Sequence, residues 1–197
     1  MYHFFVEPHQ IGAEEIRIEG ADVNHIRNVL RMKPGEEILI SSREGGDYFC
    51  RVEELEPEYV SAKILEEWEN KELPARIHLF QGLPKGDKME LIIQKAVELG
   101  AYRVVPVSMK RSVVKLDAKK ADAKRKRWNA VSESAAKQSK RSLIPEVAPL
   151  MTYKEAVKEA AGYDMVLLPY ESADGIRKTR ELLASVKPGT DIAVFIG

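Results

Sequence analysis

The chain has 197 residues and no formal net charge at neutral pH, with 44 % hydrophobic and 31 % charged residues, which is an ordinary globular composition. No run approaches the ~18 apolar residues of a membrane span, and the first residues lack the basic-then-apolar pattern of a secretory signal. The single cysteine, Cys50, excludes an intrachain disulfide framework and a multi-cysteine metal site. We therefore expect a cytoplasmic protein without a membrane segment, because a cysteine-poor chain suits a reducing compartment.

The zero net charge hides an asymmetry between the two parts of the chain. Residues 1–72 contain 8 Lys and Arg against 17 Asp and Glu, a net charge of −9, so residues 73–197 carry +9. Within residues 103–141 there are 13 basic and 3 acidic side chains. This asymmetry indicates two domains, 1–72 and 73–197, and an anionic partner for the second.

The residue pattern of the first domain mostly predicts short β-strands. One helix interrupts the strands, with Asp22 as its expected N-cap and Val23, Ile26 and Leu30 on one face. Several short strands with one helix predict a small closed β-barrel. The expected strands are Tyr2–Val6, Glu15–Ile18, Glu37–Ser41, Tyr48–Val52 and Tyr59–Leu65.

From Arg76 onward, strands alternate with helices. Asp87 and Glu90 have the spacing of a capping box at a helix start, and Gly100 is a suitable stop for that helix. The buried stripe of this helix is expected to be Met89, Ile92, Ile93, Ala96 and Leu99. Because the strands are apolar without alternation, they predict a parallel sheet covered on both faces. The expected strands are 77–81, 103–107, 144–148, 165–168 and 192–196, and the further helices are 117–140, 152–161 and 174–185.

The segment Gly82–Lys88 lies between a predicted strand and a predicted helix, where a phosphate-binding loop would lie. Three residues rather than four lie between its glycines, and Asp87 stands where the P-loop lysine would follow the second glycine. A carboxylate at a helix start also repels phosphate, so a nucleotide P-loop is not supported. Lys85 and Lys88 remain candidates for contact with a nucleic-acid backbone.

The basic side chains between residues 110 and 141 admit two interpretations. On a helix, the side chains of residues 119–127 point in nearly every direction around the helix axis, so much of this charge suits a solvated surface. The remaining basic side chains can bind phosphates, with an affinity that falls as the salt concentration rises. Trp128 is more typical of a core anchor than of a base-stacking platform. Arg111 and Arg141 are candidates for positioning phosphate or base, and Gln138 is a candidate for base contacts.

A basic island, His25–Lys33, lies inside the acidic domain. It indicates either contact with an anion or the neutralised C-terminus of a helix. The four histidines have no metal-ligand spacing, and the hydrolase and dinucleotide glycine motifs are absent.

Several stretches together resemble the bacterial ribosomal RNA small subunit methyltransferase E family of the SPOUT superfamily. The resemblance extends over essentially the whole chain, with the blocks in the same order and at similar spacing. It rests on His25–Met32, Leu83–Glu90, Ile93–Gly100, Arg111–Lys115, Arg127-Trp128, Ala135–Ser139 and Leu168–Glu171.

The resemblance implies an N-terminal PUA-like β-barrel followed by a parallel α/β SPOUT domain with a trefoil knot. It also implies transfer of a methyl group from S-adenosyl-L-methionine to N3 of a uridine in 16S ribosomal RNA, by a homodimer. Residues at the carboxyl end of the sheet would then hold the cofactor: Leu168, Tyr170, Glu171, Ile196 and Gly197. The residues expected to contact RNA are His25, Arg27, Arg31, Lys85, Lys88, Arg111, Gln138 and Arg141. No general base is identified, and a non-catalytic RNA-binding or ribosome-associated module is the alternative.

The last predicted strand reaches Ile196-Gly197, where members of the resembled family continue into further cofactor loops and the knot. We therefore expect the native protein to extend past Gly197, and residues 1–197 alone to bind no cofactor and to be inactive.

Overall fold

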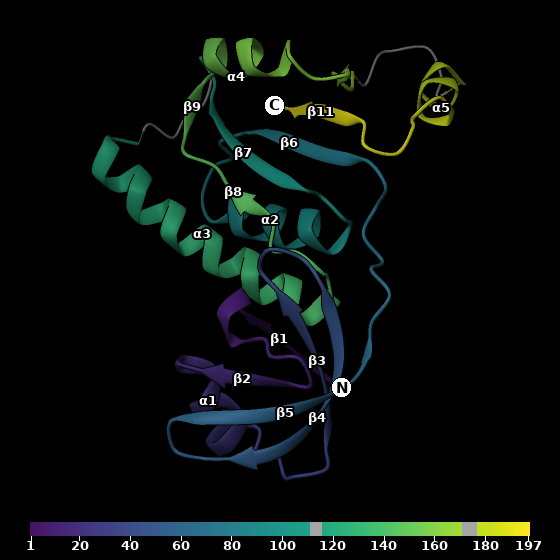
Figure 1. The fold of residues 1–197 in the computed structure, drawn as a ribbon. Helices are drawn as coiled ribbons and strands as arrows, with labels where there is room; N and C mark the ends of the chain where they lie inside the picture. Colours follow the sequence, from purple (N-terminus) through teal and green to yellow (C-terminus); the bar gives the residue numbers. More distant parts are fainter. Residues whose placement is uncertain (111–115, 171–176) are drawn as a thin grey trace. The chain divides into compact units, whose positions relative to one another are not determined.

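The computed structural model describes residues 1–110, 116–170 and 177–197, and these form two compact units (Figure 1). Unit 1 consists of Met1–Glu72 and Ala136–Ile144, and unit 2 consists of Leu73–Ala135 and Pro145–Gly197. Residues 136–144, which the sequence analysis places in the second domain, thus group with unit 1. They do so because Lys137 Nζ lies 3.1 Å from the carboxylate of Asp22, and Arg141 binds Glu72. The division of the chain into two functional domains, residues 1–72 and 73–197, stays a prediction.

Unit 1 is built on a five-stranded sheet with the strand order β1-β3-β4-β5-β2. Strand β1 runs parallel to β3, and the other neighbours are antiparallel. All five predicted strands are present, and the sheet path ends at β1 and β2, so hydrogen bonds between these two strands do not close the expected barrel. The elements are β1 (Tyr2–Val6), η1 (Pro8–Gln10), β2 (Glu15–Glu19), α1 (Ala21–Asn24), η2 (His25–Val29), β3 (Glu37–Ser42), β4 (Asp47–Leu55) and β5 (Tyr59–Glu67).

The predicted cap of the helix in unit 1 is wrong. Gly20 with φ 77° is the N-cap, and Asp22 lies in the first turn of α1, where its carboxylate binds Lys137. The following residues, His25–Val29, continue as a π-helical turn rather than as α-helix. Ile26 on this turn is fully buried, as its apolar spacing predicted.

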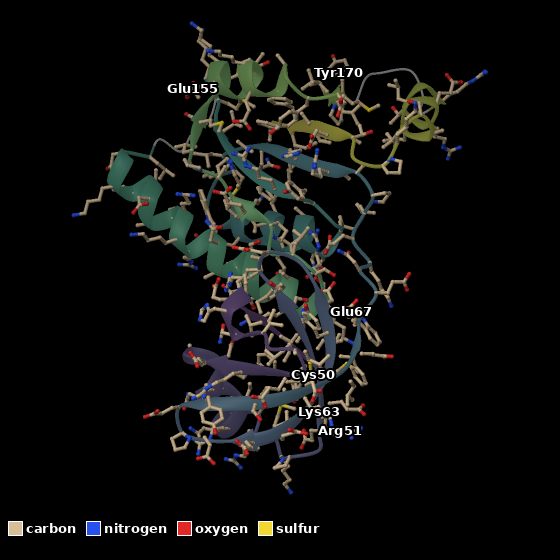
Figure 2. The ribbon with its side chains drawn as sticks, in the orientation of Figure 1. Cys50, Arg51, Lys63, Glu67, Glu155 and Tyr170 are labelled. Atoms are coloured by element: carbon tan, nitrogen blue, oxygen red, sulfur yellow. The ribbon has the colours of Figure 1, made fainter. Side chains whose placement is uncertain are left out.

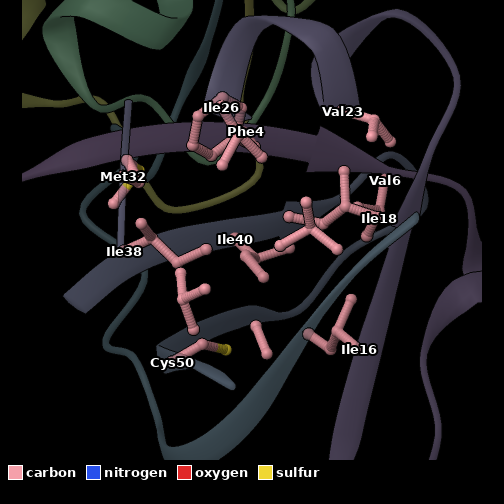
Figure 3. Close-up of a cluster of buried hydrophobic side chains, with 13 residues drawn as sticks. Phe4, Val6, Ile16, Ile18, Val23, Ile26, Met32, Ile38, Ile40 and Cys50 are labelled. Carbon is pink, nitrogen blue, oxygen red and sulfur yellow. The ribbon is translucent and has the colours of Figure 1, made fainter. Parts of the chain in front are cut away.

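The core of unit 1 follows from alternation along the strands. On β2, Ile16 and Ile18 are buried while Glu15, Arg17 and Glu19 face solvent. Because successive side chains of a strand point to opposite faces, the acidic residues stay solvated without disturbing the core. Figure 3 shows the resulting cluster, which includes Phe4, Val6, Ile16, Ile18, Val23, Ile26, Met32, Ile38, Ile40 and Cys50.

Unit 2 contains a parallel sheet with the strand order β10-β11-β6-β7-β8, and β9 also pairs with β7. The predicted parallel α/β class is therefore confirmed. The predicted strand 144–148 shrinks to two residues, and β9 is too short for its pattern to be recognised. The elements are β6 (Arg76–Gly82), α2 (Lys88–Glu98), β7 (Arg103–Ser108), α3 (Ala118–Ser139), β8 (Glu146–Val147), β9 (Met151–Thr152), α4 (Tyr153–Ala160), β10 (Met165–Leu167), α5 (Arg177–Ala184) and β11 (Asp191–Ile196).

Helices cover both faces of this sheet, with α2 and α3 on one side and α4 on the other (Figure 1). On the α4 side, Phe80 and Phe195 stack with ring centroids 4.6 Å apart, and Ala156 and Ala160 of α4 belong to the same buried cluster. On the other side, α2 buries Met89, Ile93 and Val97. The predicted stripe was wrong at its end, because Leu99 is the C-cap and is 80 % exposed.

Ion pairs tie the amino ends of the parallel strands together. Arg76 Nε and His78 Nε2 on β6 lie 2.7 Å and 2.8 Å from Oδ1 of Asp191 on β11. The hydrogen bonds from Arg76 and His78 lower the pKa of Asp191 to about 2. Arg103 at the start of β7 donates to Glu159 on α4 at 2.6 Å. Ligands of parallel sheets bind at the opposite, carboxyl ends, so we interpret this network as structural.

Gly100 after helix α2 provides a test of the fold. Its φ is 97°, and a Cβ there would lie 2.8 Å from Cδ1 of Leu73. We therefore expect Gly100→Ala to lower the free energy of unfolding by about 1–3 kcal/mol through backbone strain and overlap. Chemical denaturation at neutral pH measures this change.

The matched control is Gly162→Ala, at a glycine that follows helix α4. Its nearest neighbour to an added Cβ is the Glu159 carbonyl at 3.5 Å, and its φ lies outside the left-handed region. The control should change stability by less than about 0.5 kcal/mol. Equal losses in the two variants would contradict the account of Gly100.

Candidate functional site

The carboxyl ends of strands β6, β7, β10 and β11 meet at one edge of the sheet in unit 2, because all four strands are parallel. In such sheets, the segments that follow the strands form the ligand site. The segments that the structure describes here are 83–87 after β6, 109–110 after β7, 168–170 after β10 and Gly197 after β11.

Gly82 permits a close approach of strands at this edge. A Cβ on Gly82 would lie 3.2 Å from Met109 Cγ, 3.3 Å from Gly197 Cα and 3.4 Å from the Ile196 carbonyl oxygen. The ends of β6 and β11 are therefore packed directly against each other.

Apolar side chains at this edge are left uncovered in the described part of the chain. Leu168 and Tyr170 are each 70 % exposed, and Ile196 is 38 % exposed. Figure 2 labels Tyr170 on the segment that follows β10. Burial of these side chains against a ligand with apolar surface would be favourable. Glu171, the fifth residue expected to contact cofactor, lies outside the described residues.

The segment after β6 differs from its prediction at the helix start. Asp87 is the N-cap of α2, but its side chain makes no capping hydrogen bond, so the predicted capping box is wrong. Arg127 on α3 binds Glu90 instead, with Nε 2.7 Å from Oε1 and Nη2 2.8 Å from Oε2. Lys85 and Lys88 are exposed, as contact with a nucleic-acid backbone requires.

A cavity of about 220 Å³ lies between this segment and α3. Trp128 forms part of its wall and is only 4 % exposed, so the interpretation of Trp128 as a core anchor is confirmed. Lys124, one turn earlier on α3, brings an ammonium group to the cavity. The full lining is Leu83, Pro84, Gly86, Asp87, Met89, Glu90, Leu116, Lys124 and Trp128.

The basic island of unit 1 lies beside residues from the end of α3. The ion pair between Lys137 and Asp22 brings these residues next to the α1–η2 segment, which carries His25 and Arg27. His25 is exposed, and so is Arg31, which has a left-handed φ of 54° after the π-helical turn. Gln138 is also exposed. These side chains of unit 1 can therefore reach a polyanion in solvent.

Arg141 has a structural environment. It is 7 % exposed, its Nε lies 3.1 Å from both carboxylate oxygens of Glu72, and Glu72 also accepts from the Ser142 amide at 2.9 Å. Burial of a charged pair makes the loss of one partner costly, so we interpret Arg141 as holding residues 136–144 to Glu72. Arg111 lies outside the described residues.

His3 is a buried polar residue that the sequence analysis did not single out. Its Nε2 lies 2.8 Å from Ser41 Oγ, and Ser41 donates to Asp47. Burial lowers the pKa of His3 to about 4, an effect that Asp47 opposes and that the nearby Lys137 and Lys140 reinforce. Nothing in the local sequence indicates this relay, because it joins β1, β3 and β4 across 44 residues of chain.

Other classes of site find no support in the described ranges. Residues 1–110, 116–170 and 177–197 contain no group of three His, Cys, Asp or Glu side chains placed to hold a metal ion. Within the same ranges, no helix has the length and apolarity to cross a membrane.

Two parts of the chain each match a known protein family. Residues 71–197 match the RNA methyltransferase domain family, and residues 18–65 match the RNA methyltransferase PUA domain family. The chain is 36 % identical over 205 residues to the ribosomal RNA small subunit methyltransferase E of Bacillus subtilis, covering 100 % of this chain and 80 % of that protein. The chain belongs to the ribosomal RNA small subunit methyltransferase E family, which confirms the resemblance seen in its motifs.

Two solved structures support this assignment. A ribosomal RNA small subunit methyltransferase E from Neisseria gonorrhoeae, bound to S-adenosyl methionine, is 28 % identical with a TM-score of 0.76, covering 99 % of this chain and 79 % of that chain. A methyltransferase of Legionella pneumophila in complex with the same cofactor is 25 % identical with a TM-score of 0.79, covering 100 % of this chain and 79 % of that chain. The expected fold, a PUA domain followed by a parallel α/β methyltransferase domain, is confirmed. The SPOUT assignment and the trefoil knot stay predictions.

The low pKa of His3 gives unit 1 a specific acid response. The unfolded chain binds a proton at the ordinary histidine pKa of 6.5, and the folded chain binds it only near pH 4. Protonation therefore favours the unfolded chain, so the free energy of unfolding should fall by about 2–3 kcal/mol from pH 6.5 to pH 4. Urea denaturation across this range, monitored in wild type and His3→Gln, should show a shallower decline in the variant.

His9→Gln is the control, because His9 is exposed on η1 of the same unit. This variant should keep the pH dependence of the wild type. A His3→Gln protein with an unchanged decline would show that other groups cause it.

Proposed function

We propose that the protein transfers a methyl group from S-adenosyl-L-methionine to N3 of a uridine in 16S ribosomal RNA. The observation that carries the proposal is the joint occurrence of an RNA methyltransferase domain with an open carboxyl edge and a PUA unit with exposed basic residues. The cofactor-bound relatives, which share this fold, support the choice of methyl donor.

The cofactor site consists in our proposal of Leu168, Tyr170, Glu171, Ile196 and Gly197. The described residues of this set fit such a ligand, because Leu168 and Tyr170 offer uncovered apolar surface after β10. S-adenosyl-L-methionine supplies an electrophilic methyl group when bound. The chain positions the partners and excludes water from the reacting atoms.

The RNA interface consists in our proposal of His25, Arg27, Arg31 and Gln138 in unit 1 and Lys85, Lys88 and Arg111 in unit 2. Arginine and lysine side chains bind phosphates and fix the register of the strand, and Gln138 can read a base edge. The uridine must leave the base stack to expose N3, and its N3 proton must be lost before the methyl group is accepted. Arg141 is outside this interface in our proposal, because Glu72 engages its guanidinium.

Further parts of the proposal concern the whole protein. We propose that it acts as a homodimer in the cytoplasm, with residues 1–72 as the RNA-binding domain and 73–197 as part of the catalytic domain. The expectation that residues 1–197 alone bind no cofactor also belongs to this proposal. Calorimetric titration with S-adenosyl-L-methionine measures the cofactor affinity of this chain and of the Bacillus subtilis relative. We expect binding by the relative and none by residues 1–197.

The activity is tested by complementation. The full product of the gene is expressed in Bacillus subtilis lacking its own small subunit methyltransferase E, and nucleosides of 16S RNA are analysed by mass spectrometry. We expect N3-methyluridine to return at one position. Its absence, with soluble protein that still binds 16S RNA, would instead favour a non-catalytic ribosome-associated module.

The RNA interface of unit 1 is tested by removing two charges. We expect the Arg27→Gln/Arg31→Gln double variant to raise the Kd for a 16S RNA fragment roughly tenfold. The slope of log K against log salt concentration should become shallower by the equivalent of about one to two phosphate contacts. Filter binding at several salt concentrations measures both quantities.

The matched control is Arg51→Gln/Lys63→Gln, which removes the same charge from neighbouring positions of β4 and β5 (Figure 2). Its Kd should change less than about twofold, because a specific interface depends on where the charges lie. If the two double variants weaken binding equally, unit 1 contributes only net charge.

A further inference from the structure

The cavity between the β6–α2 segment and α3 has a volume and a lining that suit one small ring. Its volume of about 220 Å³ lies below the ~300–1,000 Å³ that is typical of pockets for drug-sized ligands. Leu83, Met89 and Trp128 are almost fully buried and give it apolar walls. Leu83 directly follows β6, so the cavity adjoins the carboxyl edge of the sheet.

Two oppositely charged groups in this lining form only a loose contact. Lys124 Nζ lies 3.8 Å from Asp87 Oδ1, and the side chains are 38 % and 83 % exposed. The other charged group of the lining, Glu90, is held tightly by Arg127 at 2.7 Å. The Asp87 carboxylate also makes no capping hydrogen bond at the helix start. Asp87 and Lys124 thus place a hydrogen-bond acceptor and a donor side by side. Their contact at 3.8 Å is too loose to be what holds α2 to α3.

This donor–acceptor pair matches one base edge and opposes another. Uracil places the O4 acceptor beside the N3–H donor, so the Lys124 ammonium can donate to O4 while the Asp87 carboxylate accepts from N3–H. Cytosine has an amino donor and a bare N3 acceptor at the same two positions, which would face the ammonium and the carboxylate with like polarity. Single-stranded RNA is recognised in this way, by hydrogen bonds to Watson–Crick edges of unstacked bases.

We propose that the cavity lined by Leu83, Asp87, Lys124 and Trp128 binds an unstacked uracil base of the RNA and selects it over cytosine. The proposal rests on the proposed function, because it presupposes an RNA substrate. Lys124 and Asp87 are the specificity-determining residues. Lys124 belongs to the basic run for which phosphate binding was one interpretation, and Asp87 was not expected to contact RNA.

The test uses two RNA hexamers, adenosine strands with a single central uridine or a single central cytidine, and no methyl donor. Because the chain has two tryptophans, a Trp68→Phe background makes Trp128 the only one and lets its fluorescence report binding. We expect the uridine hexamer to bind roughly tenfold more tightly than the cytidine hexamer at the same salt concentration. Equal binding of the two hexamers would overturn the cavity proposal and leave the proposed methyltransferase function intact.

Two substitutions and one control sharpen the result. Lys124→Met should reduce the preference for uridine to about twofold or less. Asp87→Asn should weaken the preference without abolishing it, because the amide can donate to cytosine N3 while the Lys124 ammonium still faces the cytosine amino group. Lys126→Met removes the same charge from the exposed face of α3, where Lys126 pairs with Asp122 at 3.1 Å, and should keep the tenfold preference. A preference that remains undiminished in folded Lys124→Met and Asp87→Asn proteins would overturn the proposal.

The uracil could come from the uridine that is methylated or from a neighbouring one, and crosslinking distinguishes the two. 4-Thiouridine is placed at either position of a 16S RNA fragment and irradiated, and the attached peptide is identified by mass spectrometry. Crosslinks to residues 83–90 or 124–128 from either position support the cavity, and the position names the nucleotide. Crosslinks confined to other segments contradict it. Failure of every RNA to bind wild-type protein at low salt would contradict the RNA-directed function as well.

Discussion

The parallel pairing of β11 with β6 is the constraint on which the site of unit 2 depends. β11 comes about 110 residues after β6 in the sequence, yet it lies inside the sheet between β10 and β6, and its register aligns Ile196 with Gln81. The absence of a side chain on Gly82 lets the end of β11 pack beside it. This pairing brings together segments that are more than 100 residues apart in the chain, because the carboxyl ends of parallel strands share one edge.

Acidic and basic side chains occupy separate surfaces of the protein. In unit 1, acidic residues alternate with buried ones along strands such as β2, and this pattern keeps the sheet solvated. The basic residues gather around η2 and residues 136–144, where Lys137 neutralises Asp22. In unit 2, several basic residues of α3 are already paired, for example Arg127 with Glu90 and Arg125 with Glu146. The large positive charge of residues 103–141 therefore overstates the charge available to RNA. These ion pairs account for part of the basic run, and phosphate binding by the remainder stays a prediction.

The sequence predicted the strands and the class of fold because apolar alternation and apolar runs are local signals. It failed where long-range contacts decide. Asp22 and Asp87 both have cap chemistry at a helix start, but Lys137 engages the first, and the second faces a cavity instead of the helix amides. Arg141 looked like one more basic side chain, and its burial against Glu72, 69 residues away, has no local signature. The recognised motifs led to the correct family because they were considered jointly.

The contrast between Glu90 and Asp87 shows how a site can be distinguished from a scaffold on one surface. Both carboxylates line the same cavity at the start of α2, and both have a cation from α3 nearby. Glu90 is held by two short contacts to Arg127 and has little surface left, which is typical of a group that fixes α2 to α3. Asp87 is largely exposed, makes no cap and meets Lys124 only at 3.8 Å. A charged pair that contributes little to folding and borders an apolar cavity is available to a ligand with the complementary polar edge, and Arg127 and Glu90 supply the rigid frame that such recognition needs.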